Sequence, residues 1–219
     1  MSVAEPTVFG AAYSVYVRTV RLTLAEKRVK YRLEEIDVFA PGGAPRDYLE
    51  HHHPFGRIPA FEHDGFRLYE TGAITRYVDA AFAGPRLQPA DPRACARMSQ
   101  IIGVLDNYAY RTLVWDIFVE RVRASAHGRQ PDEARIAAAV PKAEMCLQAL
   151  VALKGDGPYL VGGKLTLADL HAAPMLIYFR MAKEGAALLR RAPALDAWLT
   201  ALDRRRSIRA TRSPFESAS

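Results

Sequence analysis

A run of ten residues from Ala83 to Pro92 divides this chain into two parts with different patterns. The run contains three prolines and one glycine, and a proline inside a helix removes a hydrogen bond and clashes with the preceding turn. Before the run, short strand-like segments alternate with helical ones, whereas after it only helical spacing remains. The sequence therefore predicts a mixed α/β domain over residues 1–83, a linker over residues 84–92 and an all-helical domain over residues 93–219.

In the first domain the pattern predicts the order β-α-β, a loop with room for a short helix, and then β-β-α. The apolar residues Val17, Val20 and Leu24 recur at helical spacing, and Asp64-Gly65 is a hairpin turn signal between two strands. Strands are expected over residues 7–10, 31–38, 57–63 and 66–69, and helices over residues 14–27 and 71–81.

The second domain shows helical segments separated by breaks that contain glycine and proline. Pro141 falls inside one segment and predicts a kink. Thr166 and Asp169 follow the S/T-x-x-D form of a capping box before an apolar run, so we expect them to cap a buried helix and to matter for folding, not for chemistry. Helices are expected over residues 93–126, 132–153, 166–183 and 193–205.

The chain has 219 residues and a net charge of +6, which favours anionic partners. Its basic residues are interspersed with acids and lack a stacked aromatic platform, so we expect no nucleic-acid partner. The densest basic run, Arg204-Arg205-Arg206, is interpreted as a solvated helix end that complements the helix dipole. No apolar run approaches the ~18 residues that span a membrane, and no secretory signal is visible. We therefore expect a cytoplasmic protein without membrane contact.

Cysteine and histidine usage argues against a disulfide scaffold, a zinc site and a dithiol centre. Cys95 and Cys146 lie far apart and form no C-x-x-C pair. His51, His52 and His53 are consecutive, and three neighbouring histidines in a loop cannot easily face one ion. We therefore expect no metal site, and we interpret His53 as a structural residue or one at the edge of a ligand site.

The stretch from Pro54 to Thr71 has the features of a binding edge. Pro59 cannot donate to a sheet ladder, which places it at an edge or a bulge. The Ile58-Pro59 bond is a candidate cis peptide that would turn the backbone groups of Ile58 outward. Glu70 and Thr71 then open a helix, whose N-terminus attracts a carboxylate. Together these features predict a surface that pairs with one peptide and holds its carboxylate.

Four elements follow one another along the chain: Gly10-Ala11-Ala12-Tyr13-Ser14 with Arg18 and Val20, then Pro54-Phe55-Gly56-Arg57-Ile58-Pro59, then Glu70-Thr71, and last Tyr159-Leu160-Val161-Gly162-Gly163-Lys164-Leu165-Thr166-Leu167-Ala168-Asp169. In this order they resemble the cytosolic glutathione S-transferases of the serine type, most closely the phi class. The resemblance extends from about Thr7 to Arg205. It implies a thioredoxin-like N-terminal domain, an all-α C-terminal domain and a homodimer.

The resemblance implies that the chain activates the thiol of glutathione, because the thiolate is the nucleophile. A free thiol with a pKa near 8.5 is only about 3% ionised at pH 7, and lowering that pKa by about 2 needs about 2.7 kcal/mol. A hydroxyl donor and a helix N-terminus together have about that capacity. Ser14, at the expected start of a helix, is the preferred donor, although the residue also fits a plain N-cap. Tyr13 is the main rival and Tyr16 a second one.

The resemblance also assigns the other parts of glutathione to residues of the first domain. The hydroxyl and backbone N–H of Thr71 would bind the γ-glutamyl carboxylate, and Glu70 would bind the ammonium group. The backbone of Ile58, held in place by Pro59, would pair with the cysteinyl part. A strand end followed by a helix cap is the structural alternative for Glu70-Thr71, and it explains Thr71 better than Glu70.

Two arginines depart from the family pattern. Arg57 stands where many phi-like members carry glutamine; its charge could reach a ligand carboxylate, and a solvated strand residue is the alternative. Arg46 is the only basic candidate for the glycine carboxylate in the loop that usually supplies a His-Lys pair, and arginine suits carboxylates.

The second substrate is expected between the domains, against the long helix that follows the linker. Four residues there stand at i, i+3, i+4 and i+7 and would share one face of an α-helix. An aromatic stripe is also typical of a core, and its arginine favours an electrophile with some polarity or negative charge. The residues are Tyr108, Arg111, Thr112 and Trp115.

The leading hypothesis is transfer of glutathione to an electrophilic small molecule, with thiolate attack as the chemical step and glutathione as a co-substrate without a further cofactor. Peroxide reduction or isomerisation by the same thiolate is an enzymatic alternative, and a non-catalytic interaction module is a third reading of the same fold. A glutaredoxin-like activity is disfavoured because Ser14 stands where a cysteine is needed.

Overall fold

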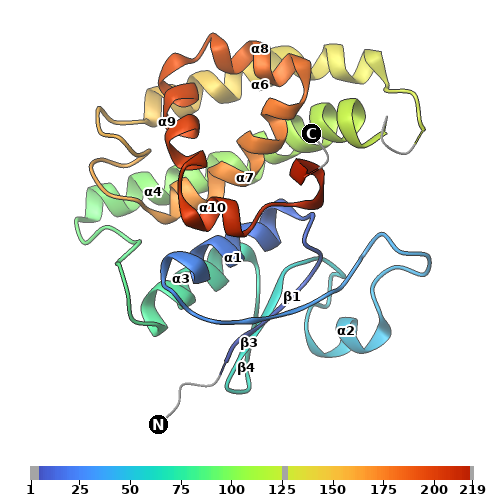
Figure 1. The fold of residues 1–219 in the computed structure, drawn as a ribbon, viewed down its shortest axis with the longest axis vertical. Helices are drawn as coiled ribbons and strands as arrows, with labels where there is room; N and C mark the ends of the chain where they lie inside the picture. The colour runs from blue at the N-terminus through green and yellow to red at the C-terminus, as the bar shows by residue number, and fades with distance from the viewer. Residues whose placement is uncertain (1–4, 125–127, 218–219) are drawn as a thin grey trace. The chain divides into compact units, whose positions relative to one another are not determined.

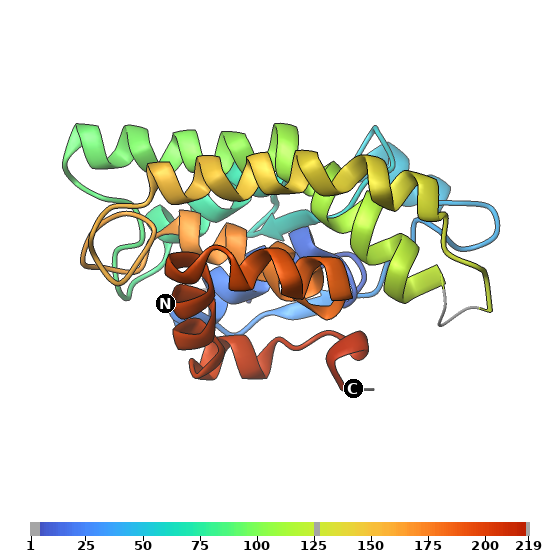
Figure 2. The ribbon, with the colours of Figure 1, turned by 90° about the horizontal axis from the view of Figure 1, so that it is seen from above.

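The computed structural model describes residues 5–124 and 128–217. The chain divides into two compact units, which are drawn together in Figures 1 and 2. The first unit consists of Met1–Leu87 together with Arg205–Ser219, and the second of Gln88–Arg204. The C-terminal segment thus belongs to the first unit, whereas the sequence analysis assigned all of residues 93–219 to the helical domain.

The first unit is built on a four-stranded sheet with the order β2-β1-β3-β4. Strand β1 pairs with β2 in parallel, and the pairs β1–β3 and β3–β4 are antiparallel. This arrangement confirms the predicted β-α-β and β-β-α order. The elements are β1 (Thr7–Phe9), α1 (Val15–Glu26), β2 (Arg32–Glu34), α2 (Arg46–His51), β3 (Ala60–His63), β4 (Phe66–Tyr69) and α3 (Thr71–Ala81).

Alternation along the strands places two separate apolar clusters on the two faces of this sheet. Val8 and Phe61 face one side and pack with apolar residues of α1 and α3, which contact each other. Their neighbours Phe9 and Ala60 face the other side and pack with Tyr48 of α2. Helices therefore pack on both faces of the sheet, while the edge strand β4 stays largely exposed.

Two strands are shorter than the sequence predicts. Strand β3 begins at Ala60 and not at Arg57, because Pro59 has no N–H to contribute to a ladder. Strand β2 covers only Arg32–Glu34, because its partner β1 has three residues and pairs with those three.

The second unit contains α4 (Pro92–Val104), a π-helix η1 (Leu105–Arg123), α6 (Glu133–Leu153), α7 (Leu167–Met181), α8 (Lys183–Arg190) and α9 (Pro193–Asp203). Helix α7 lies at its centre, since Leu167–Phe179 is buried throughout and contacts α4, η1, α8 and α9. The sequence analysis missed α8. Gly185 explains the sharp turn into it, because a Cβ there would stand 1.8 Å from the carbonyl oxygen of Phe179.

Helix α6 is long and apolar enough to meet a membrane-span criterion, with a mean hydropathy of 1.5 over an 18-residue window. The sequence analysis found no apolar run of that length, because charged residues interrupt the alanine-rich stretch. Only 33% of that window is buried, although α6 does bury Ile136, Leu147 and Leu150 within the second unit. Pro141 lies inside α6, as the sequence indicates.

The C-terminal segment of the first unit packs on α1. It contains α10 (Arg206–Ala210) and the short 3₁₀ helix η2 (Pro214–Ser217), and α10 contacts α1 (Figure 1). Arg205 donates to both carboxylate oxygens of Glu26 on α1, at 2.9 and 2.7 Å. The interpretation of Arg204-Arg205-Arg206 as a solvated helix end is therefore wrong for Arg205, because a sequence pattern cannot show a partner 179 residues away.

Candidate functional site

The register of the sheet brings three loops to one of its ends. Phe9 of β1, Ala60 of β3 and Tyr69 of β4 are aligned side by side. Because the pairs are antiparallel, the residues after Phe9, before Ala60 and after Tyr69 all lie at this end. The loop that leads to Ser14, the Ile58-Pro59 peptide and the Glu70-Thr71 pair therefore meet there.

Glycine at position 10 allows the first two of these loops to approach each other. Gly10 has a φ of +148°, and a Cβ there would stand 3.0 Å from the Cβ of Ile58 and 2.5 Å from Cγ2 of Val17. Any larger residue would push the start of α1 away from Ile58. The glycine thus fixes the distance between the helix N-terminus and the proline loop.

Ser14 is the N-cap of α1. It has extended backbone angles, and its side-chain oxygen accepts a hydrogen bond from the N–H of Val17 at 3.4 Å. The hydroxyl is the acceptor in this bond, so its own proton stays available to donate to a ligand. Both the cap and the donor function that the sequence analysis considers are therefore compatible with this geometry.

The hydroxyl of Tyr13 is directed to the protein itself. It donates to Oδ1 of Asp37 at 2.6 Å, and the same oxygen accepts the N–H of Phe39 at 2.9 Å. These bonds tie Tyr13 to the loop after β2 and engage its hydroxyl proton, whereas the hydroxyl of Ser14 is an acceptor in its bond with Val17.

The peptide bond between Ile58 and Pro59 is cis, as the sequence analysis proposes. Tyr48 holds the loop before this peptide bond, because its hydroxyl donates to the carbonyl oxygen of Arg57 at 2.6 Å. Tyr48 is 2% exposed, and burial raises the pKa of its hydroxyl, so it stays protonated as a donor. Sequence reasoning missed Tyr48, because no local motif shows which carbonyl a buried tyrosine will reach.

Glu70 has an unusual backbone conformation, with φ at +69° and ψ at +115°. Residues with a Cβ rarely adopt positive φ, and such strain concentrates at functional sites. Glu70 is exposed and its side chain makes no cap bond, while Thr71 is 7% exposed at the first position of α3. The sequence analysis named both residues but had no signal for the backbone angle, which the meeting of β4 and α3 imposes.

His53 is a buried residue close to two charged residues at this end of the sheet, Glu70 and Arg57. Its ring is buried and packs on Tyr69 at a centroid distance of 4.8 Å. Burial lowers the pKa of the His53 imidazole, Glu70 raises it, and Arg57 lowers it. His53 is therefore a neutral side chain that packs on Tyr69 near Glu70 and Arg57. This agrees with its interpretation as a structural residue.

The two arginines that depart from the family pattern are both exposed. The guanidinium of Arg46 binds Glu50 at 2.7 Å within α2, and its side chain is 91% exposed. Arg57 lies on the loop before the cis peptide and acts on His53 through its charge. Arg57 is thus at the sheet end with Glu70, whereas the described contact of Arg46 is a helix-surface ion pair.

The four residues expected on one helix face belong to the π-helix η1. In a π-helix the backbone hydrogen bonds join residues five apart, as the bond from the N–H of Ala124 to the carbonyl oxygen of Val119 shows at the end of η1. The i, i+3, i+4, i+7 argument assumed an α-helix and is therefore wrong for this segment. Tyr108 and Arg111 are exposed, Thr112 is buried and Trp115 is half-buried.

Thr166 and Asp169 form a capping box at the start of α7. The carboxylate of Asp169 is fully buried and accepts four hydrogen bonds, each at 2.8 Å. Burial raises the pKa of this carboxyl, and the hydrogen bonds counteract that effect. The donors are the N–H groups of Leu160 and Thr166, the hydroxyl of Thr166 and the indole of Trp198.

The described residues contain no metal cluster, and neither cysteine belongs to the first unit. Within residues 5–124 and 128–217, no group of three or more His, Cys, Asp or Glu side chains is placed to hold an ion. Both cysteines lie in the second unit, Cys95 on α4 and Cys146 on α6. Burial raises the pKa of the Cys146 thiol, which makes it a poor nucleophile.

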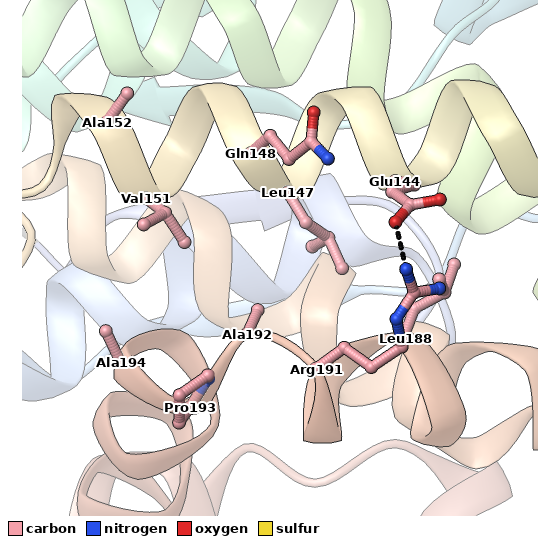
Figure 3. Close-up of a pocket in the computed structure, with 10 residues that line it drawn as sticks. All are labelled: Glu144, Leu147, Gln148, Val151, Ala152, Leu188, Arg191, Ala192, Pro193 and Ala194. Carbon is pink, nitrogen blue, oxygen red and sulfur yellow. Dashed lines mark hydrogen bonds and ion pairs between the residues drawn. The ribbon is translucent and has the colours of Figure 1, made fainter.

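A separate groove of about 460 Å³ lies in the second unit, where α6 faces α8 and the start of α9 (Figure 3). Its wall is apolar apart from Gln148 and an ion pair of Glu144 with Arg191 at 2.5 Å. None of its lining residues was predicted to bind a substrate.

The fold and the sheet end define a class of protein: a thioredoxin-like domain with a cis-proline loop, followed by a helical domain. Residues 8–86 match the family model of the glutathione S-transferase N-terminal domain, and residues 133–201 match that of the C-terminal domain. The chain belongs to the glutathione S-transferase family, and its plant relatives support the phi class.

Similar proteins agree along most of the chain. A glutathione S-transferase of Hyoscyamus muticus is 31% identical over 191 residues, which cover 86% of this chain and 89% of the relative. The crystal structure of glutathione transferase F7 from Populus trichocarpa is 26% identical, with a TM-score of 0.83 over 94% of this chain and 97% of that one. A theta-class enzyme of Xanthomonas axonopodis, solved with glutathione bound, is 26% identical with a TM-score of 0.80 over 95% and 97%.

Proposed function

We propose that this chain conjugates glutathione to electrophilic small molecules. The observation that carries the proposal is the convergence of Ser14, the Ile58-Pro59 peptide and the Glu70-Thr71 pair at one end of one sheet. Two helices, α1 and α3, also begin at this end, and their N-termini favour negative charge. A thiolate and a carboxylate are the two anions that the proposal requires there.

Each group of glutathione has a matching group in the site. Thr71 and the first turn of α3 bind the γ-glutamyl carboxylate, and Glu70 binds the ammonium group. The backbone of Ile58 pairs with the cysteinyl part and directs the thiol toward Ser14 at the start of α1. Arg57 adds a cation for a ligand carboxylate; Arg46 is a weaker candidate because Glu50 already neutralises it.

The chemical step is attack of the glutathione thiolate on an electrophilic carbon. The thiol proton leaves to solvent, the sulfur lone pair forms the S–C bond, and either a leaving group departs with its bonding pair or a conjugated double bond accepts the electrons. The hydroxyl of Ser14 donates to the thiolate and stabilises it before attack. Glutathione is the co-substrate, and the step needs no further cofactor.

Ser14 is preferred over Tyr13 because the hydroxyl of Tyr13 already donates to Asp37.

Peroxide reduction or isomerisation by the same thiolate stays an alternative to conjugation. A non-catalytic interaction module would have no use for the strained backbone of Glu70. The electrophile-binding residues that we propose are the four on η1, Tyr108, Arg111, Thr112 and Trp115, of which Tyr108 and Arg111 are exposed.

Binding to immobilised glutathione tests the proposal directly. The protein should be retained on the resin and released by free glutathione, and it should conjugate glutathione to an activated aryl halide. A protein that passes through unretained and is inactive would contradict the proposed enzymatic function and favour the non-catalytic interaction module.

We further propose a cytoplasmic location, where glutathione is abundant, with no membrane or nucleic-acid partner.

Replacing Glu70 should separate ligand binding from backbone strain. Glu70→Ala and Glu70→Gly both remove the partner of the ammonium group, so both should weaken glutathione binding about tenfold, or about 1.4 kcal/mol. Glycine accepts positive φ, so Glu70→Gly should be more stable than Glu70→Ala by about 1 kcal/mol. Calorimetric titration and urea unfolding measure the two effects. Unchanged affinity in both variants would remove Glu70 from the site.

We propose that the chain forms a homodimer through the loop before β3. Phe55 on this loop is 71% exposed and stacks edge-on against Tyr69 at 6.3 Å, and an aromatic side chain so exposed is typical of an interface anchor. Phe55→Ser should convert dimer to monomer in light scattering. Phe66→Ser, which removes another exposed aromatic on β4, should leave the dimer intact, and a Phe55→Ser protein of unchanged mass would contradict the assignment.

A further inference from the structure

The C-terminal segment holds α1 by two ion pairs at opposite ends of that helix. At one end, Glu26 binds Arg205 and also accepts the hydroxyl of Ser207 at 2.5 Å. At the other end, Arg18 binds Glu216 of η2 at 2.6 Å. Glu26 lies eight positions after Arg18 on α1, so the segment is tied to the helix at two distant points.

Arg18 is the more deeply enclosed of these anchors, since its side chain is 1% exposed. Its two terminal nitrogens donate to the two carboxylate oxygens of Glu216, at 2.6 and 3.2 Å. The guanidinium also donates to the carbonyl oxygen of Ile208 at 3.2 Å and reaches the hydroxyl of Thr211 at 3.5 Å. The side chain of Arg18 thus contacts three residues of the C-terminal segment, Ile208, Thr211 and Glu216.

Glu216 is itself fixed in place. Its side chain is 12% exposed, and Oε1, which makes the 2.6 Å bond with Arg18, also accepts the N–H of Ser213 at 2.8 Å. Thr211 and Ser213 on the same segment are buried. The carboxylate is therefore presented to Arg18 by a folded turn, which favours a single geometry for the pair.

This anchor lies one helical turn from the proposed thiolate donor. The backbone N–H of Arg18 donates to the carbonyl oxygen of Ser14 at 2.9 Å. A shift of Arg18 therefore moves the first turn of α1, where Ser14 is the N-cap. The Glu26 anchor lies three turns from Ser14, at the last residue of the helix.

We propose that Glu216 is a positioning residue: through Arg18 it sets the place of Ser14 and of the α1 N-terminus relative to the glutathione thiol. The inference rests on the proposed function. It predicts that loss of the carboxylate lets the first turn of α1 relax, which weakens the hydrogen bond to the thiolate. Misplacement of a catalytic group by a fraction of an ångström lowers rates strongly.

The test compares Glu216→Ala with the matched change Glu26→Ala in the full chain. Ultraviolet absorbance of the thiolate gives the thiol pKa of bound glutathione across a pH series, and kcat/KM is measured with one electrophile. In Glu216→Ala the thiol pKa should rise and kcat/KM at neutral pH should fall about tenfold. In Glu26→Ala both should stay near the wild-type values, although both variants should melt at lower temperature. If Glu216→Ala does not fold, Glu216→Gln keeps the size of the side chain and supplies the same comparison.

Three outcomes would overturn the inference. An unchanged thiol pKa in the Glu216 variant would make the pair purely structural. An equal rise in both variants would reflect general loosening of the segment. A fall in the thiol pKa would show that the charge of Arg18, once Glu216 no longer balances it, acts on the thiolate directly and that position is not the controlling factor. Failure of the wild-type protein to bind glutathione would instead contradict the proposed function, which separates the two claims.

Discussion

Ser14→Ala is expected to lower kcat/KM at pH 7 by up to about 25-fold, because a full return of the thiol pKa from about 6.5 to about 8.5 would reduce the ionised fraction from about three quarters to about 3%. The helix start remains in the variant and keeps part of the stabilisation. The loss should fall mainly on kcat at saturating glutathione, since the hydroxyl acts on the ionised sulfur more than on the bound thiol. Steady-state rates with one electrophile, measured from acidic to alkaline pH, give the comparison. At high pH, where the thiol ionises without help, the variant should recover toward the wild-type rate.

Tyr13→Phe is the matched control for this experiment. Its hydroxyl donates to Asp37 at 2.6 Å, so its removal should change kcat/KM by no more than about twofold. A reversal, with Tyr13→Phe inactive and Ser14→Ala unaffected, would assign the thiolate donor to Tyr13. Equal and large losses in both variants would show that the Asp37 loop also holds α1 in place.

Asp169→Ala is expected to produce the largest loss of stability among the changes considered. It removes the acceptor of four donors that are buried with it, and each buried donor left without a partner costs about 1–3 kcal/mol. The sum of at least about 4 kcal/mol is a large part of the stability of a typical domain. The melting temperature should fall by about 10 °C or more, at about 2–4 °C per kcal/mol for a chain of this size.

Asp169→Asn should be destabilised as well. Each oxygen of the carboxylate accepts two donors, so one N–H₂ group of asparagine must face two of them. Asp156→Ala, on an exposed loop of the same unit, is the control and should leave the melting temperature unchanged. A folded Asp169→Ala protein with wild-type melting would contradict the structural function of the capping box, and lost turnover at full stability would indicate a function in chemistry.

The elements that the sequence predicted well are those set by neighbours along the chain. The capping box follows from Thr166 and Asp169 three residues apart, and the cis peptide from the proline at the start of a strand. The order of strands and helices in the first unit follows from periodicity and from the Asp64-Gly65 turn. Each of these signals acts over a few residues, so a single sequence contains it.

The features that the sequence did not show are set mostly by contacts between residues that lie far apart along the chain. The ion pairs of Arg18 with Glu216 and of Glu26 with Arg205 join residues more than 170 positions apart. The positive φ of Glu70 arises where β4 turns into α3, and glutamate carries no signal for it. The π-helical hydrogen bonding of η1 changed which residues share a face, because apolar spacing alone does not distinguish the two helix types.

The pKa of the thiol of bound glutathione is the most direct measure of the central claim that this sheet end stabilises a thiolate. Titration of the thiolate absorbance in the complex with wild-type protein should give a value about 2 below the pKa of about 8.5 of a free thiol, and Ser14→Ala should move it back toward that value. A wild-type complex that binds glutathione but leaves the thiol pKa near 8.5 would contradict the account.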